Sequence, residues 1–346
     1  MLLTSSISSA LQSQQLARAR QVAKTSPSLG NASITNGEFE AAEWWEDHAA
    51  LFADALAEWG PLHPELYDAE THVASFIDSR LLEAVTELEQ AAASGRDVDE
   101  SSLRRIFTPA ADGVWRFPLF TPRFCDMLLA ELQHAKASGV PLRRPNGMNR
   151  YGAILETLPG GLGFERTLDY LSQRFLRPLS QMLYPWLIAA GDADDHYGFV
   201  VRYKVGEDVE LAQHADASVA TLNVNIGVPG FTGGSLAFRG VRFVEQDPET
   251  KPPTNVDFAD FAPGEAILHL GGQYHSALPL TSGERVNLIV WLFGEHGVVR
   301  VAPQDEWSRL QPHQRWSRAQ TSPVERAVAP AEDDGEVEDA AMHDEL

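Results

Sequence analysis

The sequence predicts an α+β fold in which helices flank an antiparallel sandwich or jelly roll. After about residue 196, short runs rich in Val, Ile, Leu and Phe follow one another, each bounded by Gly, Pro or Asp. Regular short strands with turn signals between them are typical of such all-β cores. Before that point, apolar residues recur at helical spacing instead. The 346 residues suffice for this core and for extensions at both ends.

The first predicted helices lie in an acidic region from Glu38 to Gln90, where glycine and prolines between residues 60 and 64 interrupt the apolar pattern. A further helix is predicted from Phe120 to Ala137, because Thr121-Pro122 suits a helix N-terminus. The later strands are expected at Phe199 to Tyr203, Ala220 to Ile226, Ser235 to Phe238, Ala266 to Leu270 and Val286 to Phe293.

The charge is concentrated in particular segments. The net charge is −22, and residues 38–100 carry 17 acids against two bases, while residues 331–346 carry eight acids and no base. We therefore divide the chain into a disordered or targeting segment (1–37), an acidic helical region (38–110), a β-rich body (111–300) and a C-terminal extension with an acidic tail (301–346). The acidic helices are interpreted as a solvated face covering the body, with a partner surface as the alternative.

Composition also excludes several classes of function. A protein this acidic repels phosphate backbones, so we expect no nucleic-acid partner. No stretch approaches about 18 consecutive apolar residues, so we expect no membrane span. The single cysteine, Cys125, excludes an intrachain disulfide and a zinc site built on several thiolates.

Candidate metal ligands lie in the strand-rich part. His214-Ala215-Asp216 is followed 61 residues later by His275, and Arg285 comes ten residues after that. Residues two apart in a strand face the same side, so His214 and Asp216 are expected to present a nitrogen and an oxygen to one ion. With His275 they form two imidazoles and a carboxylate, the facial triad of non-heme Fe(II) oxygenases.

Two other histidines compete with this interpretation. His63-Pro64-Glu65 is a second His-x-acid pair, which we interpret as an accident of a linker between helices. His269 lies in an apolar run and is interpreted as a core residue.

The stretches around these ligands resemble a known family. Phe199 to Lys204, Gln213 to Ser218 and Thr221 to Asn225 resemble the catalytic domain of 2-oxoglutarate and Fe(II)-dependent dioxygenases of the prolyl 4-hydroxylase type. Within that group they are most similar to procollagen lysyl hydroxylases and to 2-oxoglutarate and iron-dependent oxygenase domain-containing protein 2. Phe120 to Leu132 and Met148 to Gly152 extend the resemblance, which covers about residues 115–300.

The resemblance implies a double-stranded β-helix, that is, a jelly roll, and makes residues 111–300 an Fe(II)/2-oxoglutarate dioxygenase domain. It implies that His214, Asp216 and His275 bind Fe(II) and that Arg285 binds the distal carboxylate of the cosubstrate 2-oxoglutarate. A guanidinium matches a carboxylate bidentately, which agrees with that role. Tyr203 is implied as a second donor to the cosubstrate, with a core tyrosine as the alternative. The expected reaction consumes O2, and ascorbate is the implied reductant.

The expected substrate is a peptidyl Lys or Pro side chain, because Arg285-Val286-Asn287 departs from the Arg-x-Ser pattern of plant small-molecule oxygenases. An acidic rim would suit a cationic lysyl side chain. Two alternatives stay open: the same chemistry on a small molecule, or a non-catalytic jelly-roll binding module.

The last four residues, His343-Asp344-Glu345-Leu346, match the retrieval signal of the endoplasmic reticulum lumen. The first 19 residues lack the basic start and long apolar run of a signal peptide. The sequence therefore predicts a lumenal protein, with the cytoplasm or another organelle as alternatives.

Overall fold

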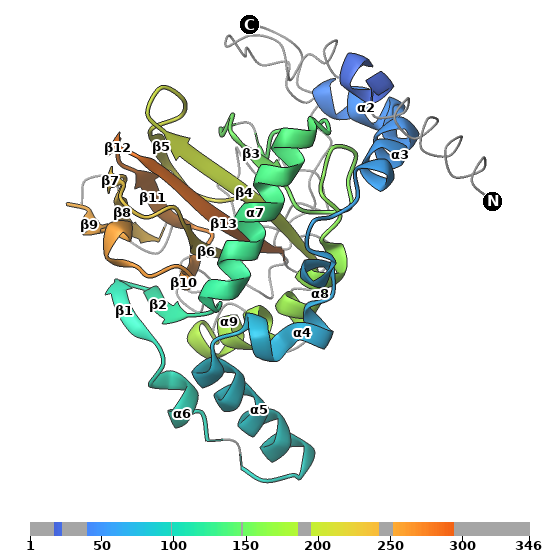
Figure 1. Ribbon diagram of the computed structural model, residues 1–346. Coiled ribbons are helices and arrows are strands. Elements are labelled where there is room, and N and C mark those ends of the chain that lie inside the picture. The colour runs from blue at the N-terminus through green and yellow to red at the C-terminus, as the bar shows by residue number, and fades with distance from the viewer. Residues whose placement is uncertain are drawn as a thin grey trace, which may run out of the picture.

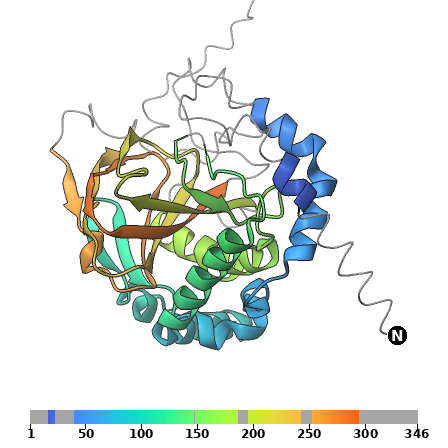
Figure 2. The same cartoon turned by 45° about the horizontal axis from the view of Figure 1, so that its top comes forward.

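Two antiparallel sheets face each other, and helices cover the outer face of the larger one (Figures 1 and 2). The structure is a computed structural model that describes residues 17–22, 40–97, 99–146, 148–185, 195–241 and 252–293. Most of the predicted segment 1–37, the extension 301–346 and the terminal His343 to Leu346 lie outside these ranges, so the predictions made for them stay predictions.

The seven-stranded sheet has the order β1-β2-β10-β6-β13-β4-β3, and the four-stranded sheet has the order β5-β11-β8-β9. The chain passes from the large sheet to the small one and back at β4-β5-β6 and again from β10 through β11 to β13, which is the chain path of a jelly roll; β12 pairs with β7 in a separate two-stranded sheet. The predicted jelly-roll core is thus confirmed. The strands are β1 (Thr108–Ala111), β2 (Val114–Pro118), β3 (Gly152–Ile154), β4 (Asp195–Lys204), β5 (Leu211–His214), β6 (Ala220–Gly227), β7 (Thr232–Gly233), β8 (Leu236–Val241), β9 (Thr254–Val256), β10 (Glu265–Leu270), β11 (Gln273–Ala277), β12 (Leu280–Ser282) and β13 (Glu284–Phe293).

The central strands are buried on both faces, which explains their continuous apolar runs. On β13, Leu288 and Val290 pack in the core between the large sheet and the helices. Ile289 packs in the second core, between the two sheets. All five predicted strands are present, within β4, β6, β8, β10 and β13.

The helices predicted between residues 38 and 90 are present, as is the one predicted at Phe120 to Ala137. Among the described residues from 40 onward, the α-helices are α2 (Glu40–Asp47), α3 (Ala49–Trp59), α4 (Ala69–Phe76), α5 (Ser79–Ala93), α6 (Ser101–Arg104), α7 (Pro122–Ser138), α8 (Glu165–Leu171) and α9 (Arg177–Leu183). The same residues also form the short 3-10 helices η1 (Pro64–Tyr67) and η4 (Phe258–Asp260) and the π-helical segment η2 (Ser172–Leu176). The Thr121 hydroxyl caps α7 by accepting from the Phe124 N–H, as expected for an N-cap threonine. Among the described helices, none is long and apolar enough to cross a bilayer.

One buried carboxylate joins the acidic helical region to the body. Glu131 on α7 is fully buried and accepts hydrogen bonds from the backbone N–H groups of Leu62 and His63 at 3.0 and 2.7 Å. These two hydrogen bonds compensate for burying a polar side chain. His63, the competing histidine of the sequence, therefore contributes its backbone to a structural contact.

Candidate metal centre and cosubstrate pocket

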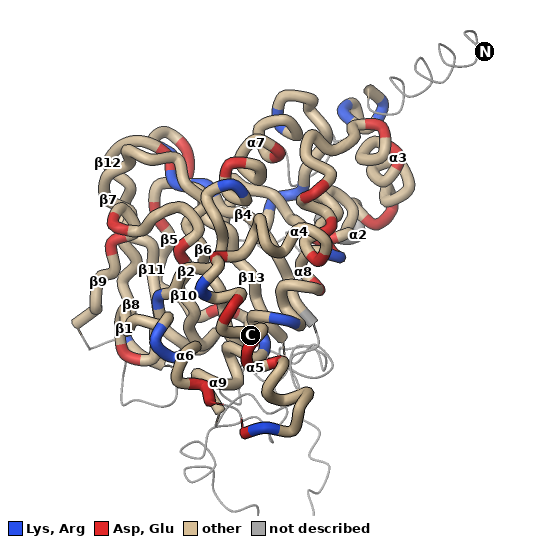
Figure 3. The backbone as a smooth tube through the Cα atoms, turned by 60° about the horizontal axis from the view of Figure 1, so that its bottom comes forward, with Lys and Arg blue, Asp and Glu red and all other residues tan. Residues whose placement is uncertain are grey.

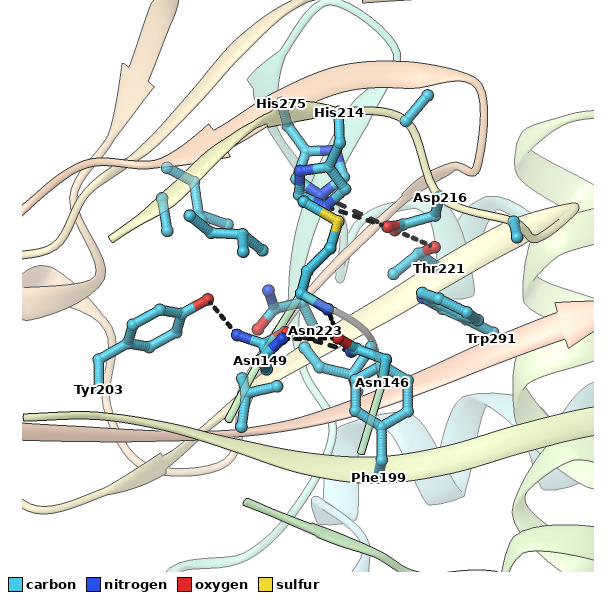
Figure 4. Close-up of a pocket in the computed structure, with 18 of the residues that line it drawn as sticks. Asn146, Asn149, Phe199, Tyr203, His214, Asp216, Thr221, Asn223, His275 and Trp291 are labelled. Atoms are coloured by element: carbon cyan, nitrogen blue, oxygen red, sulfur yellow. Dashed lines mark hydrogen bonds and ion pairs between the residues drawn. The ribbon is translucent and has the colours of Figure 1, made fainter. Parts of the chain in front are cut away.

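Two strands of the small sheet bring the predicted histidines together. His275 on β11 is the direct antiparallel partner of His214 on β5, and the two ring centroids lie 4.3 Å apart. The Asp216 carboxylate completes the group, with Oδ1 3.3 Å from Nε2 of His214 and Oδ2 3.7 Å from Nε2 of His275. One ligand atom from each residue lies within 4.8 Å of the others. Figure 4 shows both imidazoles directed toward Asp216.

The expectation that His214 and Asp216 share a strand is wrong. His214 is the last residue of β5, and Asp216 lies in the loop that leads to β6. The Asp216 N–H donates to the Gly271 carbonyl at 2.8 Å, in the turn between β10 and β11. A Cβ atom at Gly271 would lie only 1.9 Å from the carbonyl oxygen of Ser218, so only glycine permits this approach. Contacts with a distant turn thus place Asp216.

Backbone carbonyls determine which ring nitrogen of each histidine faces the centre. Nδ1 of His214 lies 2.8 Å from the carbonyl oxygen of Ala212, and Nδ1 of His275 lies 2.9 Å from that of Gln273. A carbonyl oxygen only accepts, so Nδ1 of each ring carries a proton and Nε2 is the ring atom directed at the carboxylate. Two Nε2 atoms that face one carboxylate can share a divalent cation with it, and a backbone partner at the other ring nitrogen is how metal-binding histidines are commonly oriented.

The protonation states support the same conclusion. Burial lowers the pKa of His275 to about 3, although the charge of Asp216 opposes the shift, so this imidazole is neutral near pH 7. Burial by itself raises the pKa of Asp216, but the interactions with His275 and His214 outweigh it and hold the carboxyl ionised. A neutral imidazole and a carboxylate are the forms that bind divalent metals.

A hydroxyl pair that the sequence analysis missed orients the carboxylate. Thr221 Oγ1 donates to Asp216 Oδ2 at 2.7 Å and lies 2.8 Å from the hydroxyl of Ser218. All three residues are buried. Because Thr221 is five residues from Asp216, a search for hydroxyl residues near the motif could have found it.

Arg285 is buried without a carboxylate partner. It is the second residue of β13, pairs in register with Tyr203 on β4, and has 2% of its surface exposed. Its Cζ lies 4.6 Å from the centroid of the Tyr203 ring, and Nη1 donates to the carbonyl of Gly234. Within the described residues, Arg285 has no ion-pair partner and its Nε has no hydrogen-bond partner. A buried guanidinium with free donors is suited to an anionic ligand.

All five predicted site residues line one cavity of about 250 Å³. Sequence reasoning missed the amides of Asn146, Asn149 and Asn223 and the aromatic walls Phe199 and Trp291 that line the same cavity (Figure 4).

Tyr203 is held by one of those amides. Asn149 Nδ2 donates to the Tyr203 hydroxyl at 3.2 Å, and Asn146 Nδ2 in turn donates to Asn149 Oδ1 at 3.2 Å. Tyr203 is therefore both a packed residue and a pocket residue, with its hydroxyl in a polar network. Asn149 belongs to a stretch that carried the family resemblance, but no residue type there indicated its contact.

His269 is fully buried, as expected for a core residue, and its Nδ1 lies 2.8 Å from the carbonyl oxygen of Leu270. Its ring centroid lies 4.7 Å from that of His275, so it packs directly behind a candidate ligand. It is not a member of the described ligand group.

The donor set fits Fe(II). Two imidazole nitrogens and one carboxylate oxygen on one side of an ion leave coordination positions open on the cavity side, unlike the closed cage of a structural zinc site. The buried cation at Arg285 provides the second element that a dicarboxylate cosubstrate requires.

Residues 56–188 match a family model described as an OGFOD2-like domain. The chain is 39% identical over 249 residues to the human "2-oxoglutarate and iron-dependent oxygenase domain-containing protein 2", covering 71% of this chain and 66% of that protein. It is 36% identical over 263 residues to the Arabidopsis thaliana "2-oxoglutarate and iron-dependent oxygenase domain-containing protein CP2", covering 75% and 61%. This chain is a relative of the 2-oxoglutarate and iron-dependent oxygenases.

The expected family resemblance is thereby confirmed, and this oxygenase relative spans about two thirds or less of the length of those proteins. It is also 32% identical over 190 residues to the mouse "Procollagen-lysine,2-oxoglutarate 5-dioxygenase 1", covering 52% of this chain and 24% of that protein. A Pseudomonas putida prolyl-4-hydroxylase structure matches with a TM-score of 0.34 and 17% identity, covering 52% of this chain and 87% of that one.

Proposed function

We propose that this protein is an Fe(II)- and 2-oxoglutarate-dependent dioxygenase that hydroxylates a peptidyl Lys or Pro side chain. The observation that supports the proposal best is the shared cavity, which is lined by the three candidate ligands His214, Asp216 and His275 and by the unpaired guanidinium of Arg285. A non-catalytic binding module has no need for both elements in one pocket.

The proposed role of each residue follows from its contacts. His214, His275 and Asp216 hold the ion, and Thr221 keeps the carboxylate oriented. Arg285 binds the distal carboxylate of 2-oxoglutarate with its buried guanidinium, whose Nε has no hydrogen-bond partner among the described residues. Apolar walls, including Phe199 and Trp291, keep water away from the reacting groups.

Fe(II), 2-oxoglutarate and O2 together supply the oxidising chemistry, in which a substrate C–H becomes C–OH while 2-oxoglutarate is converted to succinate and CO2. The protein's contribution is binding, orientation and the exclusion of water. Ascorbate remains the proposed reductant for iron.

The substrate class is supported by the relatives. One of them is named a procollagen-lysine dioxygenase, which favours a polypeptide side chain for this chain as well. The expected acidic rim is not part of the described lining, where Asp216 is the only carboxylate. Lys and Pro are therefore both retained, with a small molecule as the alternative substrate.

The test is succinate release from 2-oxoglutarate by the purified full chain with Fe(II) in air, with and without pools of Lys-rich and Pro-rich peptides. We expect one pool to stimulate succinate release. Each hydroxylated peptide in that pool should gain about 16 mass units, the mass of one oxygen atom. Turnover of 2-oxoglutarate that no peptide stimulates would favour a small-molecule substrate. The absence of any turnover would refute the proposal that this protein is a dioxygenase.

The matched control compares two aspartates. Asp216→Ala removes a ligand and is expected to abolish turnover, while Asp126→Ala, at an exposed position on α7, is expected to leave it unchanged. Activity that persists in Asp216→Ala would refute the metal assignment.

A further inference from the structure

A second cavity lies on the opposite face of the strands that carry the cosubstrate anchor. It has a volume of about 470 Å³, opens to solvent, and is lined by residues of α7, β3, β4 and β13 and of the loops beside them. This volume is within the range of small-molecule sites, which is about 300–1,000 Å³. The proposed dioxygenase reaction does not use this cavity.

Strand geometry separates the two cavities. Successive side chains of a strand point to opposite faces of the sheet. Tyr203 and Arg285 line the first cavity, whereas their neighbours Arg202, Lys204 and Val286 line the second. A ligand in the second cavity would thus contact the same two strands from behind.

The second cavity combines an apolar floor with a cationic rim. Its floor includes Val200 and Val286, which are buried in the sheet, and Leu129 and Leu132 of α7. The residues that line the cavity include four cations, Lys136, Arg150, Arg202 and Lys204, and one acid, Glu284. In Figure 3 basic positions lie beside β4 and α7. Such a group of cations is notable in a chain of net charge −22.

Among the described residues, the ion pairs at the rim involve Arg202 and Lys204 but not Lys136. Arg202 pairs with Glu207 at 2.5 Å, and Glu284 is shared between Arg202 at 3.7 Å and Lys204 at 3.5 Å. The exposed ammonium of Lys136 has no ion-pair partner within the described residues. Two long contacts to one carboxylate do not neutralise the rim, so it favours an anion.

The backbone conformation at the cavity wall is a second observation that supports a ligand site. Val228, which lines the cavity, has a φ of 65°, and it is the one described non-glycine residue with a positive φ. A β-branched residue in this region is strained, and such strain collects at ligand sites and switches.

We propose that the second cavity binds a small amphipathic anion, an alkyl carboxylate, with its head group at Lys136 and Lys204 and its chain over Leu129 and Leu132. The charge of the rim selects the head group, and the apolar floor selects the chain. This proposal does not rest on the dioxygenase activity.

The test is calorimetric titration of the full chain with decanoate. Excess 2-oxoglutarate is present so that it occupies Arg285 and keeps decanoate out of the first cavity. We expect binding of one decanoate per chain. Decanol, which lacks the charge, and acetate, which lacks the chain, are each expected to bind at least about tenfold more weakly, given the strength of charged hydrogen bonds and of apolar burial. Decanol binding as tightly as decanoate would overturn the anion site.

Variants locate the bound molecule. The double variant Lys136→Gln/Lys204→Gln is expected to weaken decanoate binding about tenfold, because it removes both head-group cations. Arg123→Gln, an exposed change at the other end of α7, and Arg285→Ala are expected to bind decanoate as the unchanged protein does. Loss of binding only in Arg285→Ala would place decanoate in the first cavity and refute the proposal. A synthetic peptide of residues 331–346 that binds to this cavity and displaces decanoate would also refute the proposal, because the occupant would then be an acidic segment of the protein.

Discussion

The hydroxyl of Thr221 donates a 2.7 Å hydrogen bond to the Asp216 carboxylate. This bond uses one lone pair of Oδ2 and limits rotation of the carboxylate, while Oδ1 remains directed at His214. Thr221, the second residue of β6, therefore supports a candidate ligand that lies in the loop leading to this strand.

Replacing Thr221 by Val removes this donor and keeps the shape of the side chain. We expect Thr221→Val to weaken divalent-metal binding about 10- to 100-fold, the usual cost of losing a partner of a metal ligand. Titration with Mn(II), followed by calorimetry, measures the change. Thr232→Val, on exposed β7, is the control and should bind Mn(II) normally. Equal affinities would show that Thr221 has only a packing role.

Replacing Asp216 by Asn removes the negative charge and leaves the volume almost unchanged. We expect Asp216→Asn to lose Mn(II) affinity by more than about 100-fold, because the remaining imidazoles provide only two neutral ligands. The variant should fold, since its amide N–H can donate to the Nε2 lone pairs of His214 or His275. Circular dichroism checks the fold, and metal affinity retained in the folded variant would contradict the assigned centre.

Replacing Arg285 by Lys keeps a positive charge but removes the planar fork. We expect Arg285→Lys to raise the KM for 2-oxoglutarate about 10- to 100-fold, with a smaller effect on kcat. Steady-state succinate release as a function of 2-oxoglutarate concentration measures both. Lys204→Gln, on the opposite face of the same strand pair, should leave this KM unchanged. An unchanged KM in Arg285→Lys would assign the anchor to another residue.

The ion-pair cluster at His196 predicts a pH-dependent stability. Burial lowers the pKa of His196, but the contacts with Glu156 and Asp169, each at 3.0 Å, outweigh it and raise the pKa to about 9. In the unfolded chain the value is near 6.5. The stabilisation is thus fully present below about pH 6.5 and is lost as the pH rises through about 9.

His196→Gln removes this titration. We expect the unchanged protein to lose up to about 3 kcal/mol more unfolding free energy than His196→Gln between pH 6 and pH 10. Urea unfolding at the two pH values measures the difference. Equal losses in both proteins would show that His196 is not protonated in the folded state.

Local patterns predicted much of the fold. The strands within β4, β6, β8, β10 and β13 and the helix α7 were predicted because their apolar periodicity and caps are local properties of the chain. The sequence placed His214 on a strand but extended that strand to Asp216, whereas β5 ends at His214 and has no buried residue. It missed β11, in which buried and half-buried positions alternate over only five residues. These two strands carry His214 and His275, so the weakest local signals lie at the candidate centre.

By itself, the sequence determined which residues supply the candidate ligands and anchor, because imidazole, carboxylate and guanidinium groups have distinctive chemistry wherever they lie. The tertiary structure alone decided how they meet. The pairing of β5 with β11 places His275 opposite His214 across 61 residues of chain, and the Gly271 turn holds Asp216 beside them. Register and close backbone approach depend on contacts between distant segments, which no local pattern encodes.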